Sequence, residues 1–313
     1  MKARSAVVMA CCVGAMALGF GQAFSQTQSV ADAKTPNIPG VVAGGTKVEL
    51  IGASFEGASG TVPAPDGSLL LSNRDVNKII KIAADGTIST YRDKVDLPNG
   101  IAIDHQGRLV AAQWTRPPQI GALGEKTIVL ANKFERRSFG GVNDLVVDMK
   151  GGVYFTDHVD AVVYFVGPSG QVIKIDDTMV RPNGITLSPD GKVLYVSDTN
   201  GQAVIAYDVQ PDGSVRNRRA FAMLDGVRKT ENGVTSGADG ITIDAAGRLY
   251  VTANSAVQIF SPQGQPLGTI PVPKGRMQSV AFAGSDGKTL YVTGDNIVYK
   301  IAMQAEGFKG RPK

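Results

Sequence analysis

Short apolar strands and glycine-containing turns alternate along most of the 313-residue chain. In six places a tight turn is followed by an apolar strand, as in Leu69–Ser72, Val153–Thr156 and Leu194–Ser197. The turn glycines are Gly67, Gly107, Gly151, Gly191, Gly247 and Gly287. Their spacings of 40, 44, 40, 56 and 40 residues match the length of a four-stranded propeller blade. The pattern predicts an all-β fold, a six-bladed β-propeller.

A second apolar strand comes before each turn, for example at Ile101–Asp104 and Ile241–Asp244. The two strands and the Asp-Gly type of turn between them are typical of a β-hairpin. An earlier strand is expected at Lys47–Ile51, where we expect it to complete the blade begun by the C-terminal segment and so close the ring. The propeller domain is therefore expected to span residues 46–313.

The first 25 residues are typical of a secretory signal peptide. Lys2 and Arg4 precede an apolar run over residues 6–20, and Ala23 and Ser25 supply the small residues of a cleavage site. The run is shorter than the roughly 20 residues of a spanning helix, although an uncleaved anchor is the alternative. We expect a periplasmic or secreted protein in which residues 26–45 form a mostly extended tether.

Cysteine content and charge narrow the classes of function. Cys11 and Cys12 lie in the predicted signal peptide, so the rest of the chain has no thiol for a disulfide, a metal site or a nucleophile. The net charge of +4 falls to +2 without the two basic residues of the signal peptide. This balance argues against nucleic-acid binding, and no membrane interaction is expected beyond the signal peptide.

Polar residues occupy one position of the repeat, eight residues before each turn glycine. They are Ser59, Asn99, Asn143, Asn183, Asp239 and Ser279. Because the first strand of each blade lines the channel of a propeller, these side chains are expected to converge at one mouth of the channel. A ring of side-chain oxygens suits a hard divalent cation. The alternative is that Asn and Asp here mark turns and strand entries, where their side chains bond the nearby backbone.

The second strand of each blade runs back to the same mouth and places further side chains on its rim. His158 is a candidate general base because imidazole titrates near neutral pH, with a surface-loop histidine as the alternative. Trp114 can stack on a substrate or simply fill the rim, and Arg74 and Asp198 lie at equivalent strand ends. The sequence contains no serine-hydrolase elbow, zinc-protease helix or glycine-rich phosphate loop.

At these residues the chain resembles the gluconolactonase, or senescence-marker-protein (regucalcin-like), family. The resemblance is carried by Gly141–Val147 with Val153–Asp157, Arg181–Gly184 with Ser188–Val196, Ser236–Asp244, Gly264–Pro271 and Leu290–Thr293. It implies a six-bladed propeller that hydrolyses a sugar lactone or related ester. It also implies one divalent cation, calcium first and magnesium, manganese or zinc as alternatives, held by a Glu, two Asn and an Asp. The resemblance places Asn143, Asn183 and Asp239 on three ligand positions and Asn99 on the substrate side.

The fourth ligand is where the chain departs from the family pattern. The register from Gly67 puts Ser59, rather than a glutamate, in the remaining ligand position. Glu56 lies three residues earlier, which is roughly 10 Å in an extended chain, so it can serve as the fourth ligand only if the segment loops back. With Ser59 the shell has one negative charge instead of two, and calcium affinity should fall.

Two functions follow as hypotheses. The first is a metal-dependent lactone or ester hydrolase with Asp239, Asp198 or His158 as the base, and with Asn99, Ser59, Trp114 and Arg74 facing the substrate. The second is a periplasmic small-molecule-binding protein of the same fold whose metal site is weakened or lost. A protein-interaction scaffold is a third class, but it predicts an exposed apolar rim rather than a polar pocket.

Overall fold

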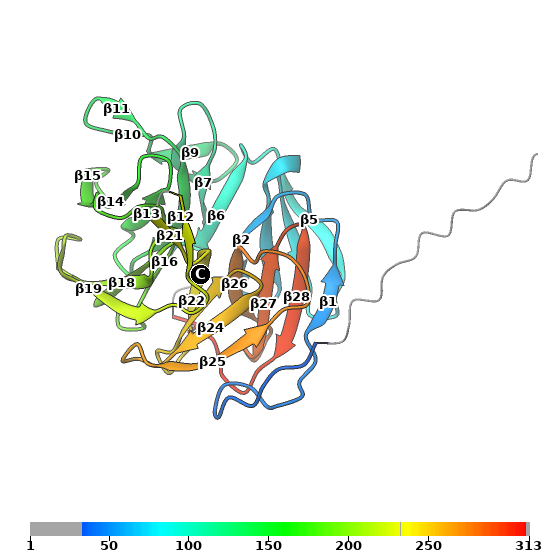
Figure 1. The fold of residues 1–313 in the computed structure, drawn as a ribbon. Helices are drawn as coiled ribbons and strands as arrows, with labels where there is room; N and C mark the ends of the chain where they lie inside the picture. Colours follow the sequence, from blue (N-terminus) through cyan, green and yellow to red (C-terminus); the bar gives the residue numbers. More distant parts are fainter. Residues whose placement is uncertain (1–32, 232, 311–313) are drawn as a thin grey trace, which may run out of the picture. The chain divides into compact units, whose positions relative to one another are not determined.

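The computed structural model describes residues 33–231 and 233–310, so the predicted signal peptide lies outside the described residues. Six four-stranded antiparallel sheets surround a central channel (Figure 1). This confirms the predicted six-bladed β-propeller. The one helical element of the described residues is a short 3-10 turn, η1 (Arg74–Val76). No helix among these residues is long and apolar enough to cross a membrane.

Each blade is an up-and-down sheet whose first strand lies innermost. Blade 1 comprises β2 (Ala58–Pro63), β3 (Leu69–Asn73), β4 (Lys78–Ile82) and β5 (Ile88–Asp93). Blade 2 comprises β6 (Pro98–Ile103), β7 (Leu109–Gln113), β8 (Gln119–Leu123) and β9 (Thr127–Ala131). Blade 3 comprises β12 (Val142–Val147), β13 (Val153–Asp157), β14 (Val162–Val166) and β15 (Val172–Asp176).

The second half of the ring follows the same order. Blade 4 comprises β16 (Pro182–Leu187), β17 (Val193–Asp198), β18 (Ala203–Val209) and β19 (Val215–Met223). Blade 5 comprises β22 (Ala238–Ile243), β23 (Leu249–Ala253), β24 (Ala256–Phe260) and β25 (Pro266–Pro271). Blade 6 comprises β26 (Ser279–Ala283), β27 (Thr289–Gly294), β28 (Ile297–Ala302) and β1 (Glu49–Gly52).

The ring closes in blade 6, where the first strand of the chain pairs with the last. Strand β1 runs antiparallel to β28, with Glu49 opposite Lys300. The inner strands contact one another in a circle, from β2 through β6, β12, β16 and β22 to β26 and back to β2. The predicted closure by an early strand is therefore confirmed, and it joins the two ends of the domain in one sheet.

The hydrophobic core consists of six clusters, each between two adjacent blades. The alternation of side chains along β13 shows how this arises. Tyr154 packs toward blade 4 with Ile185, whereas its neighbour Phe155 packs toward blade 2 with Ala112. Because successive side chains of a strand point to opposite faces, a strand between two blades must be apolar on both faces. This explains the continuous apolar runs in the inner strands.

Residues 33–45 do not form the extended tether that was expected. Ile38, Val41 and Val42 are buried in the core cluster between blades 5 and 6. The backbone turns on itself, with the amide of Ile38 donating to the carbonyl of Val42 at 3.0 Å. The sequence interpretation gave weight to glycine and proline, but the three β-branched residues bury apolar surface and hold the segment against the propeller.

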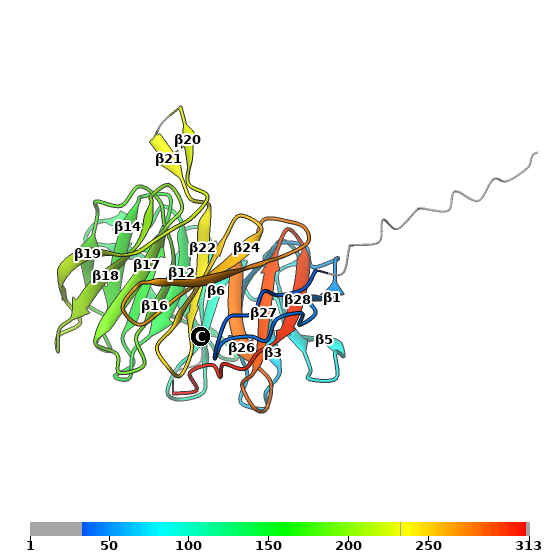
Figure 2. The same ribbon diagram turned by 60° about the horizontal axis from the view of Figure 1, so that its bottom comes forward.

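The 56-residue interval between the fourth and fifth turn glycines is longer than the others because it contains a long outer strand in blade 4 and an extra hairpin before blade 5. Strand β19 is nine residues long, and a hairpin of β20 (Arg228–Thr230) and β21 (Gly233–Thr235) follows it. The hairpin projects from the end of the propeller at which β22 begins (Figure 2). A second small hairpin, β10 (Lys133–Phe134) with β11 (Arg137–Ser138), lies between blades 2 and 3.

Candidate functional site

The six polar positions of the repeat lie at the beginnings of the inner strands. Side-chain hydrogen bonds connect four of them in a row, from Ser59 to Asn99, Asn99 to Asn143, and Asn143 to Asn183. Five of the six ring residues line a cavity of about 20 Å³, which is enough for one water-sized occupant. Its lining includes Ser59, Asn143, Asn183, Asp239 and Ser279. The structure thus brings together the side chains that the repeat register predicted.

Buried hydroxyl groups hold the backbone of this ring in place. Each belongs to the next-to-last residue of a second strand and donates to the carbonyl of the ring residue in the following blade. The pairs are Ser72 with Asn99 (2.6 Å), Thr156 with Asn183 (2.7 Å) and Ser197 with Asp239 (2.6 Å). A buried carbonyl without a donor is costly, so these hydroxyls both stabilise the channel and position the ring.

Glycines follow four of the six ring residues because adjacent inner strands approach each other closely. A Cβ on Gly184 would lie 2.2 Å from the carbonyl oxygen of Asp239, and one on Gly60 would lie 2.4 Å from that of Asn99. Gly240 faces the carbonyl oxygen of Gln278 at 2.7 Å in the same way. The Asn-Gly and Asp-Gly pairs at the ring therefore lie at the beginnings of strands rather than in turns.

The amide of Asn183 has a fixed orientation. Thr199 donates its hydroxyl hydrogen to the carbonyl of Ala238 at 2.7 Å, so its oxygen must accept from the Asn183 NH₂ group at 3.0 Å. The amide oxygen of Asn183 consequently faces the amide of Asn143, on the ring side. A ligand oxygen held in this way by a neighbouring residue is pre-organised for a cation.

Asp239 is the only ionisable residue among the six ring positions, and its side chain is 11% exposed. Its Oδ2 accepts from Nη2 of Arg276 at 2.9 Å. Burial raises the pKa of Asp239 to about 7; Arg276 opposes this rise, Asp144 adds to it, and Arg181 opposes it. A raised pKa despite two arginines means that the buried carboxylate still lacks full compensation of its charge.

Asp144 is a residue of the cavity that the sequence analysis missed. It lines the cavity directly after Asn143, at a repeat position where four other blades have glycine. Its carboxylate accepts from the backbone amides of Leu145 (2.9 Å) and Ile185 (3.2 Å). The break in the glycine pattern was the signal available in the sequence. Asp144 gives the cavity a second carboxylate beside that of Asp239, whereas Ser59 stands where the family pattern has a glutamate.

The side chains of the ring fit a hard divalent cation. Asn143, Asn183 and Asp239 offer amide and carboxylate oxygens, the donors that calcium and magnesium prefer, around a space of ion size. The buried, under-compensated carboxylate of Asp239 is the group that a cation would stabilise. Within the described residues no cluster of three or more His, Cys, Asp or Glu side chains forms a metal site, so any site here depends on asparagine.

Glu56 does not belong to this cavity. It is exposed in the turn before β2, where the following residue, Gly57, donates its amide to Asn296 at 3.0 Å. The cavity lining at this point of the ring is Ser59 and Gly60. The segment does not loop back, so the inclusion of Glu56 among the metal ligands is not supported, and Ser59 holds the position.

Three of the predicted rim residues form one cluster across blades 1 to 3. The guanidinium of Arg74 lies 4.6 Å from the ring centroid of Trp114, whose ring lies 5.5 Å from that of His158. The indole Nε1 of Trp114 donates to the carbonyl of Val142 at 2.6 Å. Burial and the charges of Arg181 and Arg74 lower the pKa of His158 to about 4, so its imidazole is neutral at pH 7.

Asp198 has a structural role that the sequence analysis did not foresee. Its carboxylate accepts from the backbone amides of Val180 (2.9 Å), Arg181 (2.9 Å) and Asn200 (3.1 Å). Asp157, at the same position of blade 3, holds the loop before β12 in the same manner. Backbone amides engage both carboxylate oxygens of Asp198, and Asp198 does not line the ring cavity, so its placement among the catalytic residues is not supported.

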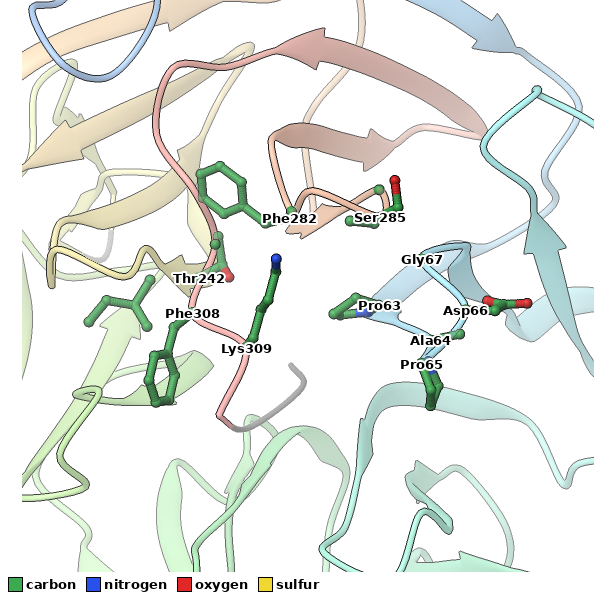
Figure 3. Close-up of a pocket in the computed structure, with 15 residues that line it drawn as sticks. Pro63, Ala64, Pro65, Asp66, Gly67, Thr242, Phe282, Ser285, Phe308 and Lys309 are labelled. Carbon is green, nitrogen blue, oxygen red and sulfur yellow. The ribbon is translucent and has the colours of Figure 1, made fainter.

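A larger cavity of about 360 Å³ lies at the opposite ends of the inner strands (Figure 3). Its walls come from the ends of β2, β22 and β26 and from the C-terminal segment, with Lys309 extending into it. Lys309 pairs with Glu306 at 2.8 Å. None of the six ring residues lines this cavity, so its size does not make it the candidate site.

Fold and cavity together define a six-bladed propeller with a ring of polar side chains at the beginnings of its inner strands. The model of the SMP-30/gluconolactonase/LRE-like family matches residues 119–296, which is more than half of the chain. The chain belongs to this family, and the resemblance noted in the sequence is confirmed.

Individual relatives agree with this assignment. The chain is 25% identical to a gluconolactonase of Zymomonas mobilis over 308 residues, covering 87% of this chain and 86% of that one. Among solved structures, a gluconolactonase of Xanthomonas campestris is similar with a TM-score of 0.75 at 23% identity, covering 87% of this chain and 95% of that one. A calcium-binding protein, regucalcin, of Agrobacterium tumefaciens gives a TM-score of 0.70 at 17% identity, covering 84% and 95%.

Proposed function

We propose that the protein is a lactonase-type hydrolase that opens a sugar lactone or related ester at the ringed mouth of the channel. The observation that carries the proposal is the convergence of Asn143, Asn183 and Asp239 on one ion-sized cavity. Family membership and the gluconolactonase relative support the reaction class. The rim cluster of Arg74, Trp114 and His158 supplies a polar and aromatic wall for the substrate.

The proposed site includes one divalent cation held by Asn143, Asn183 and Asp239. When bound, a divalent cation supplies Lewis acidity toward a carbonyl oxygen and lowers the pKa of water. The oxygen-only donor set favours calcium or magnesium over zinc, which prefers nitrogen and sulfur. Asn99 and Ser59 continue the ring on the side of blades 1 and 2, where they would face the hydroxyl groups of the substrate.

Asp239 is the favoured proton acceptor of the reaction. A water bound at its carboxylate would lose a proton to it while the water oxygen bonds to the lactone carbonyl carbon. The C–O bond of the lactone ring then breaks, and the released alkoxide takes up the proton that Asp239 accepted, which gives the open hydroxy acid. Asp239 is the one carboxylate among the six ring residues, and it lines the cavity in which the water would lie. His158, with a pKa of about 4, is neutral and would serve as a hydrogen-bonding wall residue.

The test is lactone turnover by the purified protein with calcium, magnesium, manganese or zinc supplied in turn. Glucono-1,5-lactone and an aryl ester are the probes, and the release of acid is followed with a pH indicator. Asp239→Asn should lower kcat/KM by roughly a hundredfold or more, since it removes the proton acceptor. Asp190→Asn, an exposed aspartate in the turn of blade 4, is the matched control and should be unchanged. Turnover by the wild type at the buffer rate with all four metals would refute the proposal.

A small-molecule-binding protein is the second candidate, and the Arg276–Asp239 ion pair favours it. The guanidinium of Arg276 gives the Asp239 carboxylate a cationic partner from the protein itself, in the place that a metal ion would otherwise take. Stabilisation of the wild type by a sugar acid in the presence of a chelator, with no lactone turnover under any metal, is the result expected of a binding protein. Turnover would exclude it.

We also propose that the protein is exported to the periplasm or beyond. The support is the signal-peptide pattern of residues 1–25, which lies outside the described residues. N-terminal sequencing of the protein isolated from its source should find Gln26 as the first residue. An intact Met1 in the exported fraction would show an uncleaved anchor, and retention inside the cell would refute the proposal.

A further inference from the structure

Arg276 reaches the ring from a firmly held backbone. It lies in the loop between β25 and β26, and its amide donates to Asp295 at 2.6 Å. The next residue, Met277, is fully buried and its amide donates to the carbonyl of Asn254 at 2.8 Å. With the backbone fixed on both sides, the position of the guanidinium depends on side-chain rotation alone. The Arg276 side chain is 47% exposed, so it has solvent to move into.

The guanidinium of Arg276 and a divalent cation have the same partner. Nη2 of Arg276 lies 2.9 Å from Oδ2 of Asp239, the one charged ring residue. The asparagine and serine side chains of the ring carry no charge, so Arg276 offsets the one charge of the ring, and the carboxylate of Asp144 is the other charge that lines the cavity. A guanidinium next to an ion-sized cavity repels any cation placed there, and the burial of Asp239, whose side chain is 11% exposed, weakens the screening of that repulsion by water.

We propose that Arg276 is an internal cation that holds Asp239 when no divalent cation is bound, and that it leaves Asp239 when one binds. This rests on the cation site of the proposed function. Arg276 then sets the affinity of the site, because each binding event must break its ion pair with Asp239. Release also turns a guanidinium toward the mouth of the channel, where it can pair with the carboxylate that lactone opening produces.

The test is calorimetric titration of calcium into metal-stripped protein at pH 8. Arg276→Met keeps most of the aliphatic stem and removes the charge, so calcium should bind roughly tenfold tighter or more, as expected for removal of an adjacent charge partner. Arg181→Met is the matched control. Arg181 is exposed and also acts on Asp239 through its charge, but in the described structure it forms no ion pair with that residue, so affinity should change less than about threefold.

Thermal unfolding gives a second readout that needs no substrate. In a chelator at pH 8, Arg276→Met should have a lower Tm than wild type because Asp239 loses its partner, and calcium should raise the Tm of the variant more than that of wild type. Unchanged or weaker calcium binding in the variant would overturn the proposal and would mean that Arg276 orients the carboxylate for the ion instead. Absence of calcium, magnesium and manganese binding from both proteins would also overturn it.

Measurements on wild type and Arg276→Met also distinguish the internal-cation role of Arg276 from the proposed hydrolase activity. If wild type hydrolyses a lactone but Arg276→Met binds calcium no more tightly, the internal-cation role is wrong and the hydrolase proposal stands. If the variant binds calcium more tightly but neither protein hydrolyses any lactone, the internal-cation role stands and the hydrolase proposal fails.

Discussion

The environment of His158 leads to a defined dependence of stability on pH. Burial and the nearby charges of Arg181 and Arg74 lower its pKa to about 4, against an ordinary value of 6.5. A histidine whose pKa is lower in the folded state binds protons more readily when unfolded. The unfolded state therefore gains protons as the pH falls from about 6.5 to 4, and the folded protein loses stability over that window.

The magnitude follows from the two pKa values. Between pH 7.5 and pH 4.5, linkage of a group with pKa 6.5 unfolded and about 4 folded reduces the free energy of unfolding by roughly 2.5 kcal/mol. His158→Gln removes the titrating group but keeps a polar side chain beside Trp114. The variant should therefore lose roughly 2.5 kcal/mol less than wild type over the same change of pH.

The assay is chemical denaturation of both proteins at pH 7.5 and 4.5, compared as the difference between the two pH values. Comparing these differences cancels the contribution of the carboxylates that also titrate in this range, because both proteins have the same carboxylates. His105→Gln, at the exposed second histidine, is the control and should follow wild type within about 0.5 kcal/mol. Equal pH dependence for wild type and His158→Gln would refute the argument that burial and the two arginines keep His158 neutral.

Three further predictions concern the ring. Ser59→Glu should raise calcium affinity by roughly tenfold or more in calorimetry, since it adds a charge to the ligand set; unchanged affinity would contradict the charge-count argument. Ser197→Ala leaves the buried carbonyl of Asp239 without its hydroxyl donor and should cost about 1–3 kcal/mol in denaturation, whereas exposed Ser169→Ala should be neutral. Gly184→Ala should cost a similar 1–3 kcal/mol through overpacking against Asp239; a stable variant would show that the strands can separate.

The repeat made much of the architecture predictable because its signals are local. A hairpin turn needs glycine at a set place, and an inner strand buried on both faces needs an apolar run, so spacing alone gave blade length and number. The same register located the ring residues, because each blade repeats one geometry about the channel. Counting from Gly67 placed Ser59 in the ring, whereas Glu56, which could join the ring only if the segment looped back, is exposed.

The functional assignments that failed depended on partners that sequence spacing does not show. Asp198 and Asp239 are both aspartates near the ends of apolar strands, yet backbone amides engage the first and an arginine pairs with the second. The role of a carboxylate depends on its donors and its burial, and these belong to its surroundings. Residues 33–45 show the same limit, because only the adjacent blades create the apolar surface that buries Ile38 and Val42.

By itself, the sequence determined the class of fold, the blade register and the identity of the side chains at the channel mouth. All three follow from periodicity, which each blade expresses within about 40 residues. Only the tertiary structure decided the electrostatics of the mouth. Arg276 and Asp239 lie 37 positions apart, and Trp114 meets His158 from another blade. Such contacts depend on how neighbouring blades pack, and charge interactions depend on distance and burial rather than on order along the chain.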